Sequence, residues 1–335
     1  MSIAFLNLVT AMLHVGSQRL GRWIPPPDPA GFAGLLDPAL DLPVVAKDGE
    51  FSWWDTNESF WQEATHVLVP GLPEVFPRPL AVDLSGLAEA CHLFFQEVRD
   101  SGFSYLPFWD ATYPQLLREI PDPPLGLVVG GDAMVLREAA VSVVGSRCAA
   151  NWALEWAAEF GALAARAGLG VVSGGAYGCD TAVHSGMLSA RFDRVPAIAV
   201  QAGGIANPYP RANGRIFADI AASGGCLVSE RAVHAPCRPH DFLVRNRIVS
   251  GLSMVSVIVQ AAERSGAMVT ARLAASQGRD VWVVQPPCAD VRAAGNAILM
   301  ADGATVLSDP GAAIEFLLAG SAGAGNGSQS GGSTV

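Results

Sequence analysis

The sequence has little lysine, no paired cysteines and no long apolar run, and each scarcity narrows what the protein can be. Lys47 is the only lysine, so nearly all positive charge is arginine. The six cysteines are scattered without a CxxC pair, which predicts reduced thiols in a cytoplasmic protein with no metal site and no cofactor. No apolar run reaches the roughly 18 residues of a membrane helix. We therefore expect no membrane segment, and interpret the apolar stretch 3–15 as a first core helix.

The chain is acidic overall, but its charged residues are unevenly distributed along the sequence. The net charge is −10 and the isoelectric point about 5.0, which at first sight disfavours nucleic acid. Residues 141–300, however, hold 14 of the 21 basic residues against 10 of the 31 acidic ones, a local net charge of +4. Three arginines fall in the run RPHDFLVRNR at 238–247. Since guanidinium groups match phosphate oxygens with paired donors, this block predicts a phosphate-bearing partner.

The periodicity divides the chain into three regions. Residues 1–105 are irregular, rich in Pro and Trp, and predict a divergent, mainly helical N-terminal region with a helix near 84–100. Residues 106–318 form the main domain, and the Gly/Ser-rich tail 319–335 is expected to be disordered.

From residue 141 onward, short β-branched runs alternate with amphipathic helical segments. This alternation predicts an α/β fold with a parallel sheet and helices on both faces. The expected strand and helix pairs are 141–144 with 152–167, 170–173 with 181–190, 197–201 with 215–222, 226–229 with 241–249, 254–260 with 268–277, and 281–285 with 296–302.

Three glycine-containing turns follow predicted strands and so share the carboxyl edge of the sheet, where ligands of such folds bind. The first is VGSR at 144–147, where Gly145 lets the backbone approach a phosphate and Arg147 adds paired donors. The alternative interpretation of this motif is a tight strand-to-helix turn with an arginine on the surface. The motif is not GxGxxG, and no acid stands at the ribose position, which argues against a nicotinamide enzyme.

The other two turns are SGGAYGCD at 173–180 and ERSG at 263–266, the latter followed by Thr270. Asp180 suits a helix cap, and His184 lies one turn further along. No nucleophile supports a catalytic Asp–His pair, so a helix-face pair is favoured. Phe242, among the arginines, suits either base stacking or the core at a helix start.

Seven segments, in this order, resemble the DNA-processing protein A (DprA/Smf) family: VVGSR, VVSGGAYGCDTAVH, NPYPRAN, LVSE, RPHDFLVRNRIVSGLS, AAERSGAMVTARLAASQGRDVWVV and GNAILMADGA. The similarity covers about 108–307. The resemblance implies a homodimeric, extended Rossmann-like protein that binds single-stranded DNA without catalytic activity. It implies protection of incoming DNA in natural transformation and help in loading the RecA recombinase.

Carried over residue by residue, the resemblance predicts a DNA-binding site of fifteen residues: Gly145, Ser146, Arg147, Ser173, Gly174, Tyr177, Gly178, Arg238, Phe242, Arg245, Asn246, Arg247, Ser265, Gly266 and Thr270. Three positions depart from the family. Tyr177 stands where Arg is common, Asp241 where Asn is usual and Leu243 where Pro is usual.

Two other classes of function stay open at this point. Related Rossmann-like folds hydrolyse nucleoside monophosphates, and their PGGxGTxxE run corresponds here to AAERSG at 261–266, which favours binding over hydrolysis. A nucleotide-binding or nucleotide-sensing protein is the third class.

Overall fold

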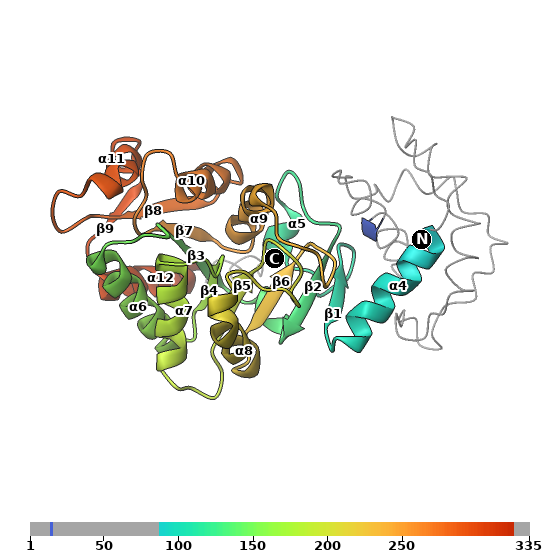
Figure 1. The fold of residues 1–335 in the computed structure, drawn as a ribbon. Helices are drawn as coiled ribbons and strands as arrows, with labels where there is room; N and C mark the ends of the chain where they lie inside the picture. Colours follow the sequence, from blue (N-terminus) through green and yellow to red (C-terminus); the bar gives the residue numbers. More distant parts are fainter. Residues whose placement is uncertain (1–13, 16–86, 325–335) are drawn as a thin grey trace, which may run out of the picture.

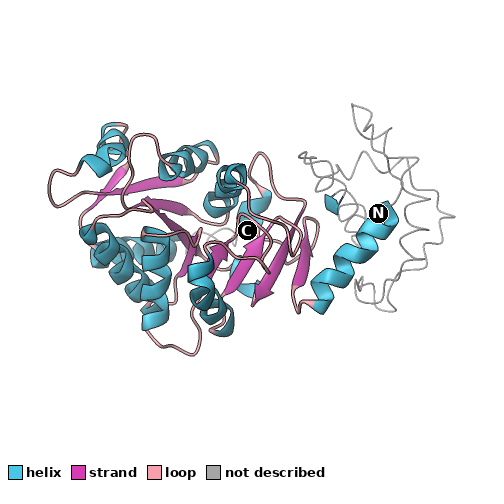
Figure 2. Ribbon diagram, viewed as in Figure 1, coloured by secondary structure: helices cyan, strands magenta, loops and turns pink. Residues whose placement is uncertain are grey.

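The computed structural model describes residues 14–15 and 87–324 and centres on one nine-stranded sheet (Figures 1 and 2). The strand order is β1-β2-β6-β5-β4-β3-β7-β8-β9. The strands are β1 Ser104–Pro107, β2 Gly126–Gly131, β3 Ala140–Val144, β4 Gly170–Ser173, β5 Ala197–Val200, β6 Cys226–Ser229, β7 Val255–Ile258, β8 Asp280–Val284 and β9 Thr305–Leu307. Strands β3 to β9 pair in parallel, whereas β2 pairs antiparallel with both β1 and β6.

Helices cover both faces of this sheet, and each face has its own apolar core (Figure 1). One core includes residues of α6 Asn151–Arg166, α7 Cys179–Ser189, α8 Gly214–Ala222 and α12 Pro310–Ala324. The other includes residues of α5 Gln115–Arg118, α9 Pro239–Gly251, α10 Gly266–Ser276 and α11 Ala294–Ala301. Short 3-10 helices span Ala133–Arg137, Arg211–Asn213 and Val291–Ala293. Helix α4, Leu87–Asp100, stands beyond β1 at one end (Figure 1).

The strands are buried on both faces, which explains their almost continuous apolar sequence. All residues of β3, β4, β5, β6 and β7 are buried. The serines of these strands are hydrogen-bonded: the hydroxyl oxygens of Ser142 in β3 and Ser256 in β7 lie 2.6 Å apart, and those of Ser173 and Ser229 donate to backbone carbonyls. A parallel sheet can therefore place its loops, and not its strands, in contact with a ligand.

The predicted α/β fold is confirmed, and each of the six predicted strand and helix pairs is present. The sequence did not predict β1, β2 or β9. The predicted domain boundary at 105/106 falls inside β1, and α12 continues to Ala324, so residues 319–324 of the expected disordered tail are helical. Most of the predicted N-terminal region, including nearly all of the helix expected at 3–15, lies outside the described residues.

The direction of chain progression reverses between β3 and β7. From β3 the chain adds β4, β5 and β6 on one side, and later β7, β8 and β9 on the other. Such a switch point opens a crevice at the carboxyl ends of the strands. The loops from the predicted glycine turns meet at this edge. Within the described part of the chain, no helix is long and apolar enough to cross a membrane.

Candidate nucleic-acid interface

The loops that follow β3 and β4 are held against each other by close backbone contact. Gly178 has a φ of +78°, and a Cβ there would lie 2.1 Å from the carbonyl oxygen of Ser146. The same carbonyl oxygen accepts a hydrogen bond of 3.2 Å from the amide of Cys179. Only glycine fits both the left-handed backbone and the close approach. Gly178 thereby fixes the position of the neighbouring residue, Arg147.

Arg147 lies over the ring of Phe242 at the first turn of α9. The guanidinium carbon is 4.6 Å from the ring centroid, a cation–π contact. Tyr209 meets the same ring edge-on, with centroids 5.3 Å apart and an interplanar angle of 70°. Arg147 and Tyr209 are exposed and Phe242 is half-buried. Phe242 belongs to neither apolar core, so these three side chains form an open, flat-faced cluster, which we call the aromatic cluster.

Arg245 forms the buried floor of this edge. Its Nη1 donates to the carbonyl oxygen of Val200 over 2.6 Å, and its guanidinium occupies the space that a Cβ at Gly174 would need. Burial lowers the pKa of Arg245 to about 10, against the opposing effect of the Asp180 carboxylate. Burial also disfavours the charged form of Asp180 and so raises its pKa. The charge of Arg245 and hydrogen bonds from the amides of Ala176 and Gly145 act in the opposite direction and lower it. Arg245 thus supports the site from below and is not presented to solvent.

The structure corrects the role predicted for Arg247. Its side chain is buried, with Nε donating to Asp122 over 2.9 Å and Nη2 to Glu230 over 2.6 Å. Burial opposes the charge of Arg247, but the two carboxylates outweigh it and raise the pKa. Because this side chain is buried and two of its three nitrogens donate to carboxylates, we do not retain Arg247 as a phosphate contact.

Arg238 is the exposed arginine of the predicted three, at the N-terminal cap of α9. Its backbone amide donates to Asp241 over 2.8 Å, and Arg231 pairs with the other oxygen of Asp241 at 2.6 Å. The acid that departs from the family pattern therefore caps α9 and is neutralised by Arg231. The helix start that carries Phe242 is consequently fixed.

The remaining predicted residues divide into accessible and internal ones. Tyr177, with 45% of its surface exposed, Gly266 and half-buried Asn246 line the open edge, and a Cβ at Gly266 would meet only open space. Ser265 caps α10 by accepting from the amide of Met268. Ser173 and Thr270 were predicted to line the site, but the structure places them in the interior. Both hydroxyls are buried and donate to backbone carbonyls, those of Val143 and Gly266.

The crevice between β3 and β7 is bridged by the protein's own side chains. Gln260 accepts from the amide of Ala150 over 2.9 Å and donates to Asp290 over 2.7 Å. Trp152 donates to the same carboxylate oxygen over 3.1 Å. Helix α6 begins at Asn151, close to the predicted start at 152, so the residues directly after Gly145 form a loop and not a helix N-terminus. This crevice is closed by a polar bridge and does not form an open phosphate cradle.

His184 does not form the considered pair with Asp180. Both residues are buried on α7, but neither ring nitrogen of His184 has a hydrogen-bond partner. Burial alone lowers its pKa to about 4. Among the residues that the structure describes, no group of three or more His, Cys, Asp or Glu could hold a metal ion.

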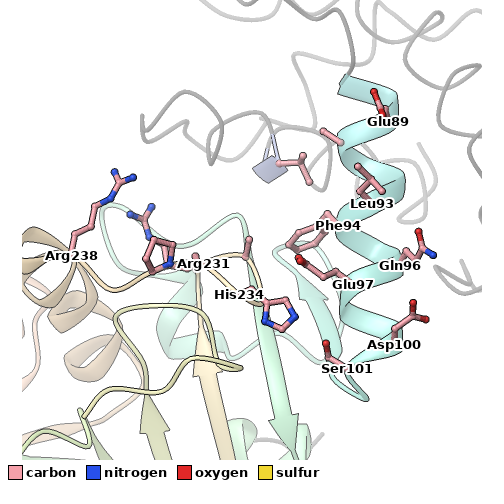
Figure 3. Close-up of a pocket in the computed structure, with 15 residues that line it drawn as sticks. Glu89, Leu93, Phe94, Gln96, Glu97, Asp100, Ser101, Arg231, His234 and Arg238 are labelled. Carbon is pink, nitrogen blue, oxygen red and sulfur yellow. The ribbon is translucent and has the colours of Figure 1, made fainter. Parts of the chain in front are cut away.

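A separate groove of about 910 Å³ lies between α4 and the loop 231–238 (Figure 3). Arg231, His234 and Arg238 line one wall, and Glu89, Glu97 and Asp100 of α4 line the other. The three carboxylates on the α4 wall repel a phosphate backbone. The open edge with the aromatic cluster is therefore the better candidate for nucleic acid.

Tyr209 is the site residue that the sequence reasoning missed, although its segment NPYPRAN was recognised. It has 44% of its surface exposed and lies in the loop between β5 and α8, which has no periodicity. The available signal was an aromatic residue in a Pro-flanked loop after a predicted strand.

The fold and this edge define an extended Rossmann-like α/β protein whose exposed site suits a ligand with flat rings and negative charge. The chain belongs to the DNA recombination-mediator protein A family, the DprA/Smf family, whose model matches residues 104–318.

Named relatives and solved structures agree with this membership. Protein Smf of Escherichia coli is 35% identical over 212 residues, which cover 63% of this chain and 56% of that protein. DNA processing protein DprA of Bacillus subtilis is 33% identical over 274 residues, 82% of this chain and 88% of that one. The structure of DNA processing protein A from Streptococcus pneumoniae has a TM-score of 0.59 at 25% identity, covering 78% of this chain and 86% of that one.

The corresponding protein from Helicobacter pylori, whose structure is described for its single-stranded DNA binding mode, has a TM-score of 0.58 at 27% identity. That likeness covers 65% of this chain and 96% of the H. pylori chain.

Proposed function

We propose that this protein binds single-stranded DNA, without catalysing a reaction, at the edge that carries the aromatic cluster. The observation that carries the proposal is the aromatic cluster, where the exposed Arg147 and Tyr209 lie together with the half-buried ring of Phe242. Unpaired bases stack on such surfaces with little regard to sequence. The single-stranded DNA binding of the H. pylori relative supports the same ligand.

The bridged crevice supports binding of a strand over hydrolysis of a mononucleotide. Nucleotide enzymes of this fold bind phosphate with free amides after the first strand. Here the amide of Cys148 donates to Ser146 and that of Ala150 to Gln260. Those donors are already satisfied inside the protein, whereas the arginine and aromatic side chains outside the crevice are accessible.

The cellular role that we propose is protection of incoming DNA in natural transformation, in the cytoplasm, followed by help in loading RecA. The family's description as a recombination mediator and the names of the DNA-processing relatives support this role. We expect the purified protein to stimulate RecA filament formation on strands coated with single-strand binding protein. Equal filament formation with and without this protein would contradict the role in loading.

Fluorescence anisotropy with three competitors tests the ligand. A labelled single strand should bind, an unlabelled single strand should displace it, and duplex DNA of equal length or a mononucleotide should compete poorly. The physical reason is that a duplex hides its bases from stacking, and a mononucleotide reaches one contact only. Equal competition by duplex and single strand would contradict the proposal, and preferential binding of the mononucleotide would favour the alternative class.

A further inference from the structure

We propose that Arg147 is the stacking surface for a base, held flat by Phe242 beneath it, and that it does not act mainly as a phosphate contact. This inference rests on the proposed binding of single-stranded DNA and assigns a specific role within that site. The guanidinium plane would lie between the phenyl ring and a nucleobase.

The first step of the argument is that one face of Phe242 is already covered. The guanidinium of Arg147 lies 4.6 Å from the ring centroid, and Tyr209 occupies a further side edge-on. A base that stacked directly on the covered ring face would have to displace Arg147. Stacking on the outer face of the guanidinium requires no displacement of Arg147, which is an exposed residue.

The second step is that the backbone holds Arg147 in place. Gly178 packs against the carbonyl oxygens of Ser146 and Arg147, where a Cβ would lie 2.1 and 2.8 Å away. The amide of Cys148 donates to the hydroxyl of Ser146 over 3.2 Å. Because this backbone is held in place, the side chain of Arg147 loses less conformational entropy when a base stacks on it.

The third step is that Phe242 is fixed as well. It lies in the first turn of α9, directly after Asp241, which accepts from the amide of Arg238 and pairs with Arg231. Both layers below the base are therefore in position before the strand arrives.

The fourth step is that no described carboxylate competes for Arg147. Within residues 14–15 and 87–324, its side chain has no hydrogen bond or ion pair, in contrast to Arg247, which pairs with two acids. A guanidinium is planar and weakly hydrated and stacks on rings, whereas the ammonium group of lysine is a compact, strongly hydrated charge. Lysine at this position would keep the charge and lose the stacking plane.

The test compares Arg147→Lys and Arg147→Ala with the wild type on two probes of equal length, oligo-dT and a strand whose central residues are abasic. A stacking role predicts that both variants weaken binding to oligo-dT by on the order of tenfold, the effect of losing one stacked base. The lysine variant should bind the abasic strand like the wild type. Arg166→Lys, at the exposed end of α6 on the opposite edge of the sheet, is the matched control and should change neither affinity.

A second readout is fluorescence of 2-aminopurine placed within the strand, measured at saturating protein so that affinity does not matter. Stacking should quench it with the wild type and less with Arg147→Lys. If the lysine variant bound oligo-dT with wild-type affinity, or lost the same affinity for both probes, the stacking role would be overturned. Either result would indicate a phosphate contact. A wild type that binds neither probe would instead contradict the proposed function itself.

Discussion

Arginines two positions apart can lie on opposite sides of a helix, as Arg245 and Arg247 on α9 demonstrate. Arg245 lies under Gly174 beside Asp180, and Arg247 pairs with Glu230 and Asp122 on the other side of the helix. Because successive helical residues are about 100° apart, residues i and i+2 cannot share a face. Neither side chain is open to a strand, unlike Arg147 after β3.

Replacement of Arg247 by alanine should therefore destabilise the protein and not merely weaken DNA binding. Removing one partner of a buried ion pair costs about 3–5 kcal/mol, because the acids left behind lose their compensation. Arg147→Ala should change the free energy of unfolding by less than about 0.5 kcal/mol, as exposed substitutions do. Urea unfolding of both variants checks this, and equal stability of the two would contradict the assignment of Arg247 to the interior.

His184 should make the stability depend on pH. Its pKa is about 4 in the folded protein and near 6.5 when exposed. Above pH 6.5 the ring is neutral in both states, so its contribution is fully present. As pH falls from 6.5 towards 4, the unfolded chain binds a proton that the folded protein does not, and up to about 2 kcal/mol is lost by pH 5.

The matching variant is His184→Leu, which removes the titrating group and its buried, unpartnered nitrogens. Thermal melting between pH 7 and pH 5 should show a smaller loss for this variant than for the wild type. Exposed His240 provides the control, since His240→Leu should retain the wild-type profile. Parallel profiles for wild type and His184→Leu would disprove the contribution of His184.

At the scale of elements, the start of α9 combines a cap and an ion pair in one residue. Asp241→Ala removes both, and we expect a loss of about 1 kcal/mol together with weaker DNA binding, since Phe242 follows directly. Asp241→Asn, which places the residue usual in the family, keeps an oxygen for the cap and should lose less. Chemical unfolding and DNA titration of both variants test this. Equal losses of stability in the two variants would show that the ion pair matters more than the cap.

The sequence predicted the central elements well because buried parallel strands have a distinctive pattern. Near-continuous apolar runs such as AVSVV of β3 alternate with helices, and no other fold class explains that alternation. It did not predict β1, β2 or β9, and for β1 and β9 the reason is that SYLP contains proline and TVL is only three residues long.

The site was harder to predict than the fold, because the exposure of a side chain is decided by packing between distant elements. The spacing of the arginines did not reveal that Asp122 and Glu230 meet Arg247 from two other segments. Tyr209 lies in an irregular loop and was not predicted, whereas Arg147 and Phe242 were predicted individually but not as a stacked pair. Contacts between loops from different strands carry no periodic signal.

At the scale of the whole molecule, we predict a homodimer that includes α11 and the neighbouring sheet edge. Leu299 is 8% exposed and belongs to a core, so a charge there would damage the fold and would not test assembly. Ile298 on the same helix is 37% exposed, and Val306 on edge strand β9 is 46% exposed. Exposed apolar groups beside an unpaired strand edge favour association.

Light scattering at micromolar concentration should give about twice 34.8 kDa for the wild type and a lower mass for Ile298→Glu. The variant should still bind a short oligonucleotide, because the aromatic cluster lies at the loops after β3 and β5 and at the start of α9, not at the β9 edge. A wild-type mass of 34.8 kDa would rule out the dimer, and an unchanged mass of the variant would place the interface elsewhere.

The contact between Gly174 and Arg245 limits how this protein can diverge. A methyl group at 174 would collide with the guanidinium, and a smaller residue at 245 would leave Asp180 buried without its compensating charge. A single substitution at any of these three positions is therefore penalised, whereas coordinated replacement by apolar residues that fill the same volume avoids both the collision and the unpaired charge. We expect relatives to change these positions together, so that the floor of the edge is inherited as a unit while the exposed residues above it vary separately.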